Sequence, residues 1–349
     1  MNPSGSTDAG SLEAMVRQVI GHQDGSRFVE ILPQLSDDLN EVDAVIQEAL
    51  RSTYPFLTEA ANYATASGGK RLRPLVILVV YRGLTSDATK PVHPLAAAFQ
   101  LIHTASLVHD DLIDHAPLRR GKPSVHEAFG LPTAIVAGDY LFVRAFQLAG
   151  RYSPEVIQRC GDASADLALG EVMQENSRFD LSIDRERYLR IVTLKTANAI
   201  AAGAEAAAMV ARAEPRVIRS LGEYGQALGI AFQLKDDALD MYGESDVTGK
   251  PLLSDLREGL PTLPSILAYQ RLSDREREEF ERLFTLRHKR QAHLLRLKEL
   301  CDTAGVREPV EREAEKWVTT AIEALHAIPP SPFRDLLEAV ASGSIQRKV

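Results

Sequence analysis

Apolar residues recur every three or four positions in one run after another from about Leu35 onward, and this spacing constrains the fold more than any other feature. Such spacing places the apolar side chains on one face of a helix. Glycine and proline fall mainly between the runs, as in Gly130-Leu131-Pro132, where they tend to end helices. Strand-like alternation is nearly absent. Helices are therefore predicted at 39–50, 75–81, 95–109, 134–149, 154–176, 185–213, 215–242 and 263–272.

These helices are expected to form one domain. Hydrophobic residues make up 45% of the 349 residues, which is enough for a sizeable core. No change of composition marks a linker, so the prediction is an all-α, single-domain helical bundle with a central elongated cavity. The charge-dense segment 275–298 is predicted to be a solvated helix or helix pair. Residues 1–35 should form a polar, partly disordered N-terminal extension, ahead of an all-α domain at 36–349.

Charge and cysteine content narrow the cellular setting. The formal net charge is −8, from 40 basic and 48 acidic residues, which argues against a nucleic-acid partner. Cys160 and Cys301 lie far apart and match no metal-site or disulfide pattern. The chain starts without a signal-peptide pattern, and no stretch approaches the roughly 20 apolar residues of a membrane span. A cytoplasmic protein is expected.

The sequence Asp110-Asp111-Leu112-Ile113-Asp114 brings three carboxylates together. Asp110 and Asp114 share one face of a helix, with Asp111 beside them. An apolar approach precedes them, so the carboxylates should lie at the edge of a buried face and require cations. Carboxylate oxygens favour magnesium, which shares its coordination shell with water and phosphate. The segment therefore predicts a magnesium-binding acidic wall.

A second acidic cluster, Asp236-Asp237-Ala238-Leu239-Asp240, repeats this geometry. Gln233, Asp236, Asp237 and Asp240 occupy one helical face at spacings of three, four and seven. A single cluster of this kind is often a solvated acidic patch, but two clusters that each follow an apolar helical run are hard to explain in that way. Two such walls can hold two or three magnesium ions, and those ions can bind a diphosphate.

A diphosphate site also requires cationic side chains. Gly68-Gly69-Lys70-Arg71-Leu72-Arg73-Pro74 supplies three cations at the start of a helix, where backbone N–H groups favour an anion. Arg119-Arg120-Gly121-Lys122 follows the first cluster, and Gly249-Lys250 follows the second. Lys195 and Thr196 interrupt an apolar helix, where a buried lysine requires a partner. Two cationic groups beside two acidic walls suggest two diphosphate substrates.

Taken in order, these motifs resemble the trans-isoprenyl diphosphate synthases, and in particular the members that make medium and long chains. The resemblance extends from about Ala66 to Pro264. It includes the segments 69–74, 103–111, 119–123, 138–140, 195–196 and 232–240, and Gln346-Arg347-Lys348 is similar to the basic tail of the family. The resemblance implies a helical bundle, usually a homodimer, that condenses isopentenyl diphosphate with an allylic diphosphate.

The resemblance also implies roles for individual residues. Magnesium would be held by Asp110, Asp114 and Asp236, with Asp111, Asp237 and Asp240 in supporting positions. Isopentenyl diphosphate would be bound by Lys70, Arg73, His103 and Arg120. The allylic diphosphate would be bound by Arg119, Lys195, Thr196, Gln233 and Lys250. One position departs from the family: Leu260 stands where a lysine is usual, which lowers the positive charge expected near the allylic diphosphate.

The expected chemistry follows from these charges. Magnesium and the Lys/Arg set stabilise the departing diphosphate, so Asp110 and Asp236 count as catalytic. Lys195 and Thr196, with nearby backbone carbonyls, are expected to stabilise the allylic cation. The incoming double bond attacks that cation, and the departing diphosphate is the expected base.

The product tail is expected to run along the helix that carries Asp110. Ala105 and Ser106 lie about one turn before it and are both small. Ile102 and Phe99 are expected to line or close the tunnel, Phe99 lying roughly 16 Å from Asp110 at 1.5 Å per residue; core packing of Phe99 is the alternative. A product of C20 or longer is predicted, and transient membrane contact would assist its release. Geranylgeranyl diphosphate or farnesyl diphosphate is the alternative product. A terpene cyclase and a non-catalytic or partner-dependent subunit of a heteromeric synthase are the alternative protein classes.

Overall fold

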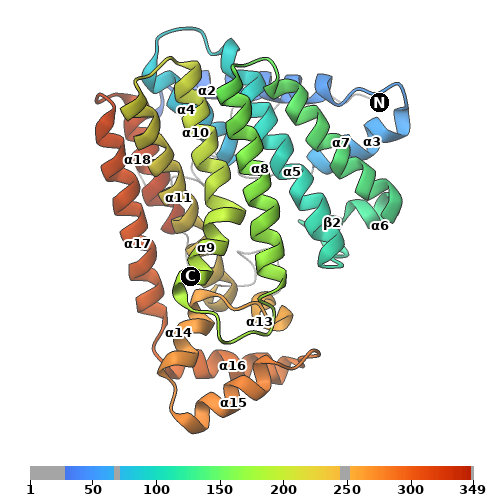
Figure 1. Ribbon diagram of the computed structural model, residues 1–349, viewed down its shortest axis with the longest axis vertical. Helices are drawn as coiled ribbons and strands as arrows, with labels where there is room; N and C mark the ends of the chain where they lie inside the picture. The colour runs from blue at the N-terminus through green and yellow to red at the C-terminus, as the bar shows by residue number, and fades with distance from the viewer. Residues whose placement is uncertain (1–27, 67–70, 244–251, 347–349) are drawn as a thin grey trace.

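The structure is a computed structural model that describes residues 28–66, 71–243 and 252–346. Within these ranges the chain is a bundle of long helices (Figure 1). The first half comprises α2 (Leu32–Ala49), α3 (Pro55–Thr65), α4 (Leu72–Leu84), η2 (Lys90–Val92), α5 (His93–Ile113), α6 (Val125–Phe129), α7 (Leu131–Ala149) and α8 (Pro154–Glu175). A short antiparallel hairpin lies between α5 and α6. Its two strands, β1 (Leu118–Arg119) and β2 (Lys122–Pro123), have two residues each.

The second half begins with one nearly continuous helical rod. It comprises α9 (Arg185–Val192), a π-helical turn η3 (Thr193–Ala197) and α10 (Asn198–Val210). The remaining elements are α11 (Pro215–Tyr242), α13 (Ser254–Glu258), α14 (Leu263–Arg271), α15 (Asp274–Phe284), α16 (Gln291–Thr303), α17 (Arg307–Ala324), η4 (Leu325–Ala327) and α18 (Pro332–Ile345). The predicted segment 185–213 is therefore helical, but a π-helical turn interrupts it.

Proline fixes where several of these helices begin. Pro154 and Pro215 stand at the first positions of α8 and α11. The missing N–H of proline costs nothing there, because the first N–H groups of a helix have no partner within the helix. The start of α2 differs slightly from the expected domain boundary at residue 36. This helix begins at Leu32, and Phe28 and Ile31 ahead of it are buried in the main core.

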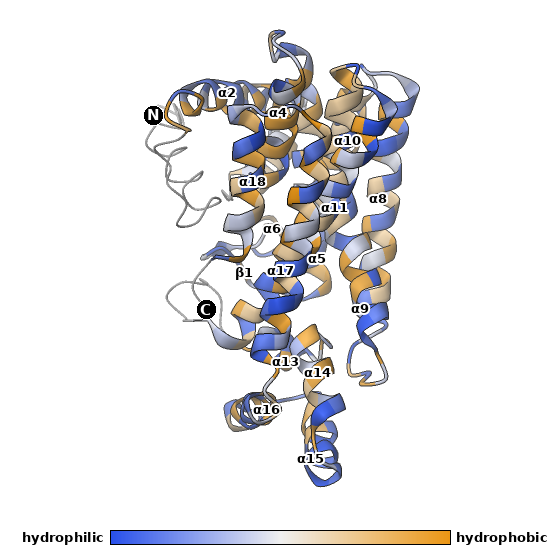
Figure 2. Ribbon diagram, turned by 90° about the vertical axis from the view of Figure 1, so that its left-hand side faces the viewer, coloured by the Kyte–Doolittle hydropathy of each residue, from blue (hydrophilic) through white to orange (hydrophobic). Residues whose placement is uncertain are grey.

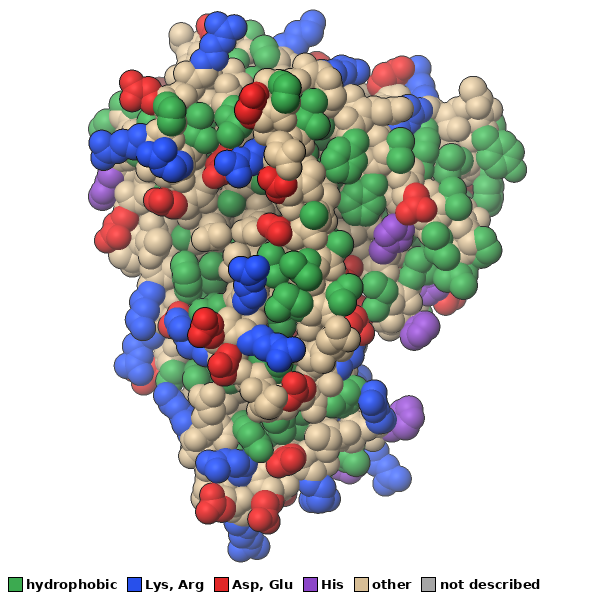
Figure 3. All heavy atoms as spheres, viewed as in Figure 1, with side chains coloured by type: hydrophobic (Ala, Val, Ile, Leu, Met, Phe, Trp, Pro, Cys, Tyr) green, Lys and Arg blue, Asp and Glu red, His purple; other side chains and the backbone are tan. Residues whose placement is uncertain are grey.

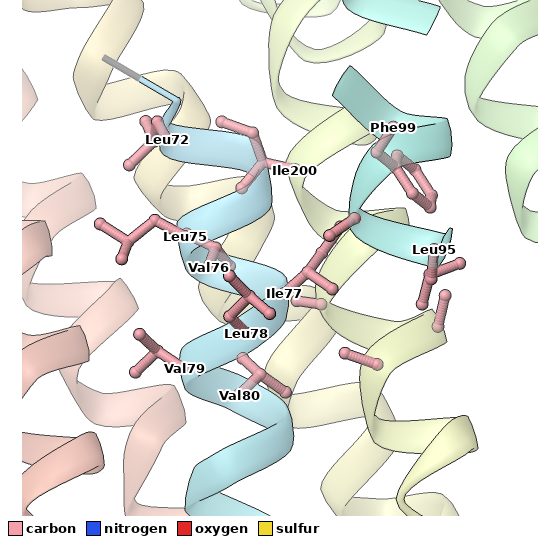
Figure 4. Packing of buried hydrophobic residues seen from close by; sticks show 14 of the residues in the cluster. Leu72, Leu75, Val76, Ile77, Leu78, Val79, Val80, Leu95, Phe99 and Ile200 are labelled. Atoms are coloured by element: carbon pink, nitrogen blue, oxygen red, sulfur yellow. The ribbon is translucent and has the colours of Figure 1, made fainter. Parts of the chain in front are cut away.

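Helix α10 lies at the centre of the bundle and packs against α4, α8 and α11. Its residues are largely alanine, which allows neighbouring helices to approach closely. Gly203 of α10 faces Ile77 of α4 and Phe99 of α5, because an added Cβ would lie 3.1 Å and 3.7 Å from their nearest atoms. Figure 4 shows Ile77 extending from α4 toward the helix that carries Leu95 and Phe99. This packing joins α4, α5 and α10 in one core.

The charge-dense segment predicted at 275–298 forms a helix pair, α15 and α16, at one end of the bundle (Figure 1). The pair has its own small core, in which the rings of Phe280 and Phe284 stack at 5.8 Å. Figure 2 shows that α15 and α17 are strongly hydrophilic on the outside, whereas α4 and α10 are largely hydrophobic. Hydropathy therefore sorts the outer helices from the central ones.

Candidate functional site

The three carboxylates of the first acidic cluster lie at the C-terminal end of α5. Asp110 and Asp111 belong to its last turn, and Asp114 immediately follows its last residue, Ile113. The C-terminus of a helix carries partial negative charge, so carboxylates there require compensating cations. The structure places a different cation near each of them: Lys195 near Asp110, Arg119 against Asp111 and Arg178 against Asp114.

Arg119 reaches Asp111 from the β1–β2 hairpin. Its Nε donates to both carboxylate oxygens of Asp111, at 2.9 Å and 3.1 Å. Arg120 and Gly121 form the two-residue turn with φ values of +53° and +77°, as a tight hairpin of this length requires. The hydroxyl of Tyr63 donates to the carbonyl of Pro123 at 2.7 Å and ties the hairpin to α3. Local turn geometry therefore fixes both arginines near α5.

The carboxyl of Asp110 is largely buried and has a displaced pKa. Burial raises the pKa of its carboxyl to about 7, while the ammonium of Lys195 opposes this shift and the nearby carboxylates of Glu171 and Asp114 reinforce it. Lys195 forms an ion pair with Glu171 of α8. Burial lowers the pKa of Lys195, but Asp110 and Glu171 outweigh that effect, so its pKa is raised. Lys195 is therefore charged and held beside the first cluster.

Residues of the second acidic cluster on α11 have different surroundings. Asp237 is buried and accepts hydrogen bonds from the hydroxyl of Tyr188 at 2.5 Å and from Nε2 of Gln233 at 2.8 Å. Burial raises the pKa of Asp237 to about 7, although both hydrogen bonds lower it. Asp240 accepts from the backbone N–H groups of Ser254 and Asp255 at 3.0 Å and 3.1 Å. Asp240 thus stabilises the start of α13, and Asp236 remains half-buried.

The π-helical turn η3 connects the two acidic clusters. Lys195 lies toward the first cluster, whereas the hydroxyl of its neighbour Thr196 donates to Oε1 of Gln233 at 3.2 Å. Gln233 in turn donates to Asp237. A π-turn inserts one extra residue into a helix and changes the direction of the following side chains. In this chain it places adjacent residues next to different acidic clusters.

Gly170 of α8 allows this turn to pack closely. A Cβ built on Gly170 would lie 2.6 Å from the backbone N of Lys195 and 2.9 Å from its Cα. Because both clashing atoms belong to the backbone, neither can move aside cheaply. We expect Gly170→Ala to lower the free energy of unfolding by about 1–3 kcal/mol and to reduce turnover by displacing Lys195.

Urea unfolding and steady-state kinetics test the expectation for Gly170. Gly161→Ala is the matched control, because Gly161 lies in the same helix and an added Cβ would meet no atom within 4 Å. That control should leave turnover unchanged and raise stability by up to about 1 kcal/mol. Equal effects of the two substitutions would show that the close approach at Lys195 has no special role.

A separate cationic group surrounds His103 on α5. Burial lowers the pKa of His103 well below its usual value, and the nearby charges of Arg73, Arg120 and Arg119 lower it further. Burial also lowers the pKa of Arg73 to about 10. The Nε of Arg73 is buried without a hydrogen-bond partner among the described residues. Arg71 of the same motif instead forms an ion pair with Asp43 of α2.

Two predicted residues, Lys70 and Lys250, lie outside the described residues, as do the glycines at 68–69 and the basic positions Arg347 and Lys348. The other charged and polar residues predicted for the site lie on α4, on or just after α5, in the hairpin, on η3 and on α11, whereas Phe99 lies in the main core. Sequence reasoning missed Glu171, Arg178 and Tyr188, which are partners of Lys195, Asp114 and Asp237. The run Glu171-Val172-Met173-Gln174-Glu175, with an acidic residue at each end of one helical turn, was an available but weak signal.

A pocket of about 530 Å³ opens between α9, α11 and α17, and none of the predicted residues lines it. Its lining includes Asp184, Arg187, Gln226, Trp317 and Thr193 of η3. The two carboxyls with raised pKa values, Asp110 and Asp237, instead lie near Lys195 and Thr196. Clustered pKa shifts are the better guide to chemistry, so the candidate site lies at the acidic clusters.

The carboxylate oxygens of the acidic clusters suit a hard cation such as magnesium, which also takes ligands from water and phosphate. In the part of the chain that the structure describes, no three His, Cys, Asp or Glu side chains are grouped as a complete metal cage. Magnesium commonly takes only one or two carboxylates and completes its shell with water and phosphate oxygens. Carboxylates at the end of α5 and on α11 fit that mode of binding.

Residues 54–301 match the family model described as polyprenyl synthetase. The chain belongs to the polyprenyl synthetase family. This polyprenyl synthetase is 33% identical over 314 residues to the octaprenyl diphosphate synthase of Escherichia coli, covering 89% of this chain and 96% of the relative. It is 34% identical over 328 residues to the chloroplastic solanesyl diphosphate synthase 1 of Arabidopsis thaliana, covering 92% and 79%.

Solved structures agree with this assignment. A polyprenyl synthase from Caulobacter crescentus, complexed with calcium and isoprenyl diphosphate, superposes with a TM-score of 0.87 at 35% identity, covering 93% of this chain and 98% of that one. A decaprenyl diphosphate synthase from Rhodobacter capsulatus has a TM-score of 0.85 at 33% identity, with coverage of 90% and 97%. The predicted family, the all-α fold and the prenyltransferase class are confirmed. No described helix is long and apolar enough to cross a membrane.

Proposed function

We propose that this polyprenyl synthetase condenses isopentenyl diphosphate with an allylic diphosphate and makes an all-trans polyprenyl diphosphate of C20 or longer. The observation that carries the proposal is the placement of Lys195 and Thr196 between two acidic clusters. The cationic group around His103 adds a second anion site. Two anion sites and a shared lysine suit the joining of two diphosphates.

The cationic group supports binding of isopentenyl diphosphate. Arg73 presents a buried Nε that lacks a hydrogen-bond partner among the described residues, and such a donor is costly unless an anion or water satisfies it. His103, whose pKa is well below its usual value, is neutral near pH 7. It can therefore donate one hydrogen bond without adding to the positive charge of Arg73 and Arg120. A diphosphate satisfies all three side chains, and Lys70 is the proposed fourth.

The acidic clusters support binding of the allylic diphosphate through magnesium. We assign two or three ions to Asp110, Asp114 and Asp236, with Asp111, Asp237 and Asp240 in support. Bound magnesium would neutralise charge on the diphosphate as it departs. Asp237 and Asp240 each have hydrogen-bonded partners that orient this wall. Arg119, Gln233 and Lys250 are assigned to the same diphosphate.

Two residues of the π-turn, Lys195 and Thr196, would stabilise the charges that form when the allylic diphosphate departs. Glu171 fixes the ammonium of Lys195, and Gln233 accepts from the hydroxyl of Thr196. With the hydroxyl hydrogen donated to Gln233, the oxygen lone pairs of Thr196 remain to stabilise positive charge. The double bond of isopentenyl diphosphate attacks the allylic cation through its terminal carbon, which leaves positive charge on the other carbon of that double bond. A proton is then lost from the carbon adjacent to this charge, which forms the new double bond, and the proton passes to the departing diphosphate. Lys195 then stabilises the charge on that leaving group.

The product length rests on the small residues of α5 and on the relatives. Ala105 and Ser106 are buried on the helix that carries Asp110, where a larger side chain would block a growing tail. Relatives of this chain include octaprenyl, solanesyl and decaprenyl diphosphate synthases. We therefore propose a long-chain product. The free, buried Cys160 and Cys301 support the reducing cytoplasm as the proposed location.

A homodimer is proposed from an exposed apolar face on α7 and α8. Its members are Ile135, Val136, Val143 and Phe146 of α7 and Leu169 and Val172 of α8, with exposed fractions between 38% and 57%. Figure 3 shows hydrophobic side chains gathered on the side of the molecule where α7 lies. An apolar patch of this kind usually marks a protein interface, and a second copy is the commonest partner for such a face.

We expect Val143→Asp to convert the dimer into a monomer, because the charge would be buried without a partner at the interface. Light scattering coupled to size-exclusion chromatography measures the mass directly. Leu295→Asp is the matched control, since Leu295 of α16 is similarly exposed, at 48% against 53% for Val143, but lies away from α7 and α8. A monomeric wild type, or equal masses for both variants, would remove this interface from the account.

The proposed reaction is tested by release of inorganic diphosphate. The purified chain with magnesium should release it only when isopentenyl diphosphate and an allylic diphosphate are both present. Chelation of magnesium should stop the release, and its return should restore it. Release from the allylic substrate alone would indicate a terpene cyclase instead, because cyclisation needs no second substrate.

A further inference from the structure

Arg178 binds three carboxylates from three different elements. It lies three residues after the end of α8. Its Nη2 donates to Oδ1 of Asp114 at 2.6 Å, its Nε donates to Glu175 at 2.7 Å and 2.9 Å, and its Nη1 contacts Glu258 at 3.3 Å. The side chain is only 18% exposed. A single guanidinium thus joins the end of α5, the end of α8 and the end of α13.

The backbone around Arg178 is held in place by its neighbour. Phe179 adopts a positive φ of 64°, and its N–H donates to the carbonyl of Gly259 at 2.7 Å. Its ring packs directly on Gly259, where an added Cβ would lie 2.4 Å from it. Arg287 and Lys289 lie over the same ring at 4.5 Å and 4.8 Å. Arg178 is therefore built into the structure beside the turn at 258–260.

The pairing of Arg178 with Asp114 has an electrostatic reason. Asp114 caps the C-terminus of α5, where the helix dipole disfavours a carboxylate, and Asp110 lies within the same charge field. A guanidinium fork removes this penalty. It also occupies Oδ1 of Asp114, an oxygen that a cation at this carboxylate would compete for. Arg178 and a metal ion therefore compete for Oδ1 of Asp114.

We propose that Arg178 holds Asp114 in the substrate-free protein and gives it up when a magnesium diphosphate binds, so that metal binding is coupled to substrate binding. This inference rests on the proposed function. Before substrate arrives, a magnesium ion has to displace a charge-assisted hydrogen bond and also meets the positive charge of Arg178. The diphosphate adds negative charge that favours both cations. By linkage, magnesium and diphosphate then strengthen the binding of each other by the same factor.

Calorimetric titration of magnesium, with and without inorganic diphosphate, tests the coupling. In Arg178→Gln, the Kd for magnesium alone should fall about three- to tenfold, because one neighbouring positive charge is gone. Binding of inorganic diphosphate should weaken, and the factor by which it strengthens magnesium binding should fall at least threefold. Arg178→Lys keeps the charge but loses the fork, so its values should lie between those of wild type and Arg178→Gln. Arg178→Lys also gives a reading if the glutamine variant fails to fold.

Arg296→Gln is the matched control for loss of a multivalent arginine. Arg296 of α16 binds Glu279 through two nitrogens, at 3.0 Å and 2.8 Å, and Glu299 at 3.1 Å, outside the candidate site. Its removal should leave both magnesium titrations unchanged. The coupling proposal is overturned if Arg178→Gln leaves the substrate-free Kd unchanged or raises it.

Asp114→Asn separates this result from failure of the proposed function. If Asp114→Asn weakens magnesium binding while Arg178→Gln does not strengthen it, only the coupling by Arg178 is wrong. If Asp110→Asn and Asp114→Asn both leave magnesium binding unchanged, the metal site itself is wrong, and the proposed reaction loses its basis.

Discussion

Asp110→Ala is expected to reduce turnover by about a thousandfold or more at every magnesium concentration. Asp110 lies at the end of α5 where burial raises the pKa of its carboxyl to about 7 and Lys195 opposes that shift. Alanine removes a carboxylate from the first acidic cluster, and Lys195 keeps its ion pair with Glu171. The loss should appear mainly in kcat, because the missing charge acts on the departing diphosphate. Steady-state kinetics over a magnesium titration give the measurement.

Two further variants show whether the effect belongs to the site. Asp110→Asn keeps the size of the side chain but removes the charge, and should be nearly as inactive as alanine. Asp274→Ala removes a carboxylate whose side chain is 96% exposed on α15, and should retain wild-type turnover. Full activity of Asp110→Ala at high magnesium would show that another group binds the metal, and the assignment of this cluster would be wrong.

Ala105→Phe is expected to shorten the product by at least one isoprene unit, and Ser106→Phe should act in the same direction. Both residues are buried on α5, with exposed fractions of 0% and 6%, about one helical turn from Asp110. A ring at either position would occupy the path along which the tail is predicted to grow. Product mass spectrometry after incubation with isopentenyl diphosphate and farnesyl diphosphate gives the chain length.

Stability measurements distinguish a blocked tunnel from a damaged core. A ring forced into close-packed core costs typically 1–3 kcal/mol, whereas a ring placed in an open tunnel should cost less. Ser106→Ala is the matched control, because it keeps the position small and should leave the product unchanged. An unaltered product distribution in both phenylalanine variants would contradict the tunnel. Phe99 lies in the main core beside Gly203, and its role as the floor of the tunnel stays a prediction.

Helix periodicity predicted most of the bundle, because apolar faces and proline starts are local properties of the sequence. The run at 154–176 became α8, and the run at 215–242 became α11 with the same bounds. Helices α3, α6, α13, α17 and α18 were not predicted. Helices α3, α6 and α13 are short, and the apolar residues of α17 are diluted by charge, as in Arg307-Glu308-Pro309-Val310-Glu311-Arg312-Glu313. Packing against α11 rather than local pattern stabilises α17.

The charged residues of the site were predictable as a set, but their pairing was not. The spacing in 110–114 indicated a shared face, yet it could not show that each carboxylate has a different cation beside it. Arg178 and Tyr188 come from segments that carry no recognisable motif, and only the tertiary fold brings them to Asp114 and Asp237. The π-turn at 193–197 was also hidden, since its sequence continues the helical pattern and Gly170 on another helix permits it.

Leu260, which stands where a lysine was expected, lies in the turn that follows α13. The backbone N–H of Leu260 donates to the carbonyl of Asp255 at 2.9 Å, within the turn that adjoins Phe179. Arg178 contacts Glu258 two residues earlier. The guanidinium of Arg178 therefore contacts the turn that contains position 260, where a lysine was expected, but it is also paired with Asp114, Glu175 and Glu258.

The central claim is tested most directly by the mass of the product that the purified chain makes alone. The chain is incubated with magnesium, isopentenyl diphosphate and each of the C5, C10, C15 and C20 allylic diphosphates in turn. The account predicts a ladder of five-carbon additions that ends at C20 or beyond with at least one starter. The account would be contradicted if a folded protein that binds magnesium made no extended product with any starter. If activity appeared only with a partner chain, the chain would be a subunit of a heteromeric synthase.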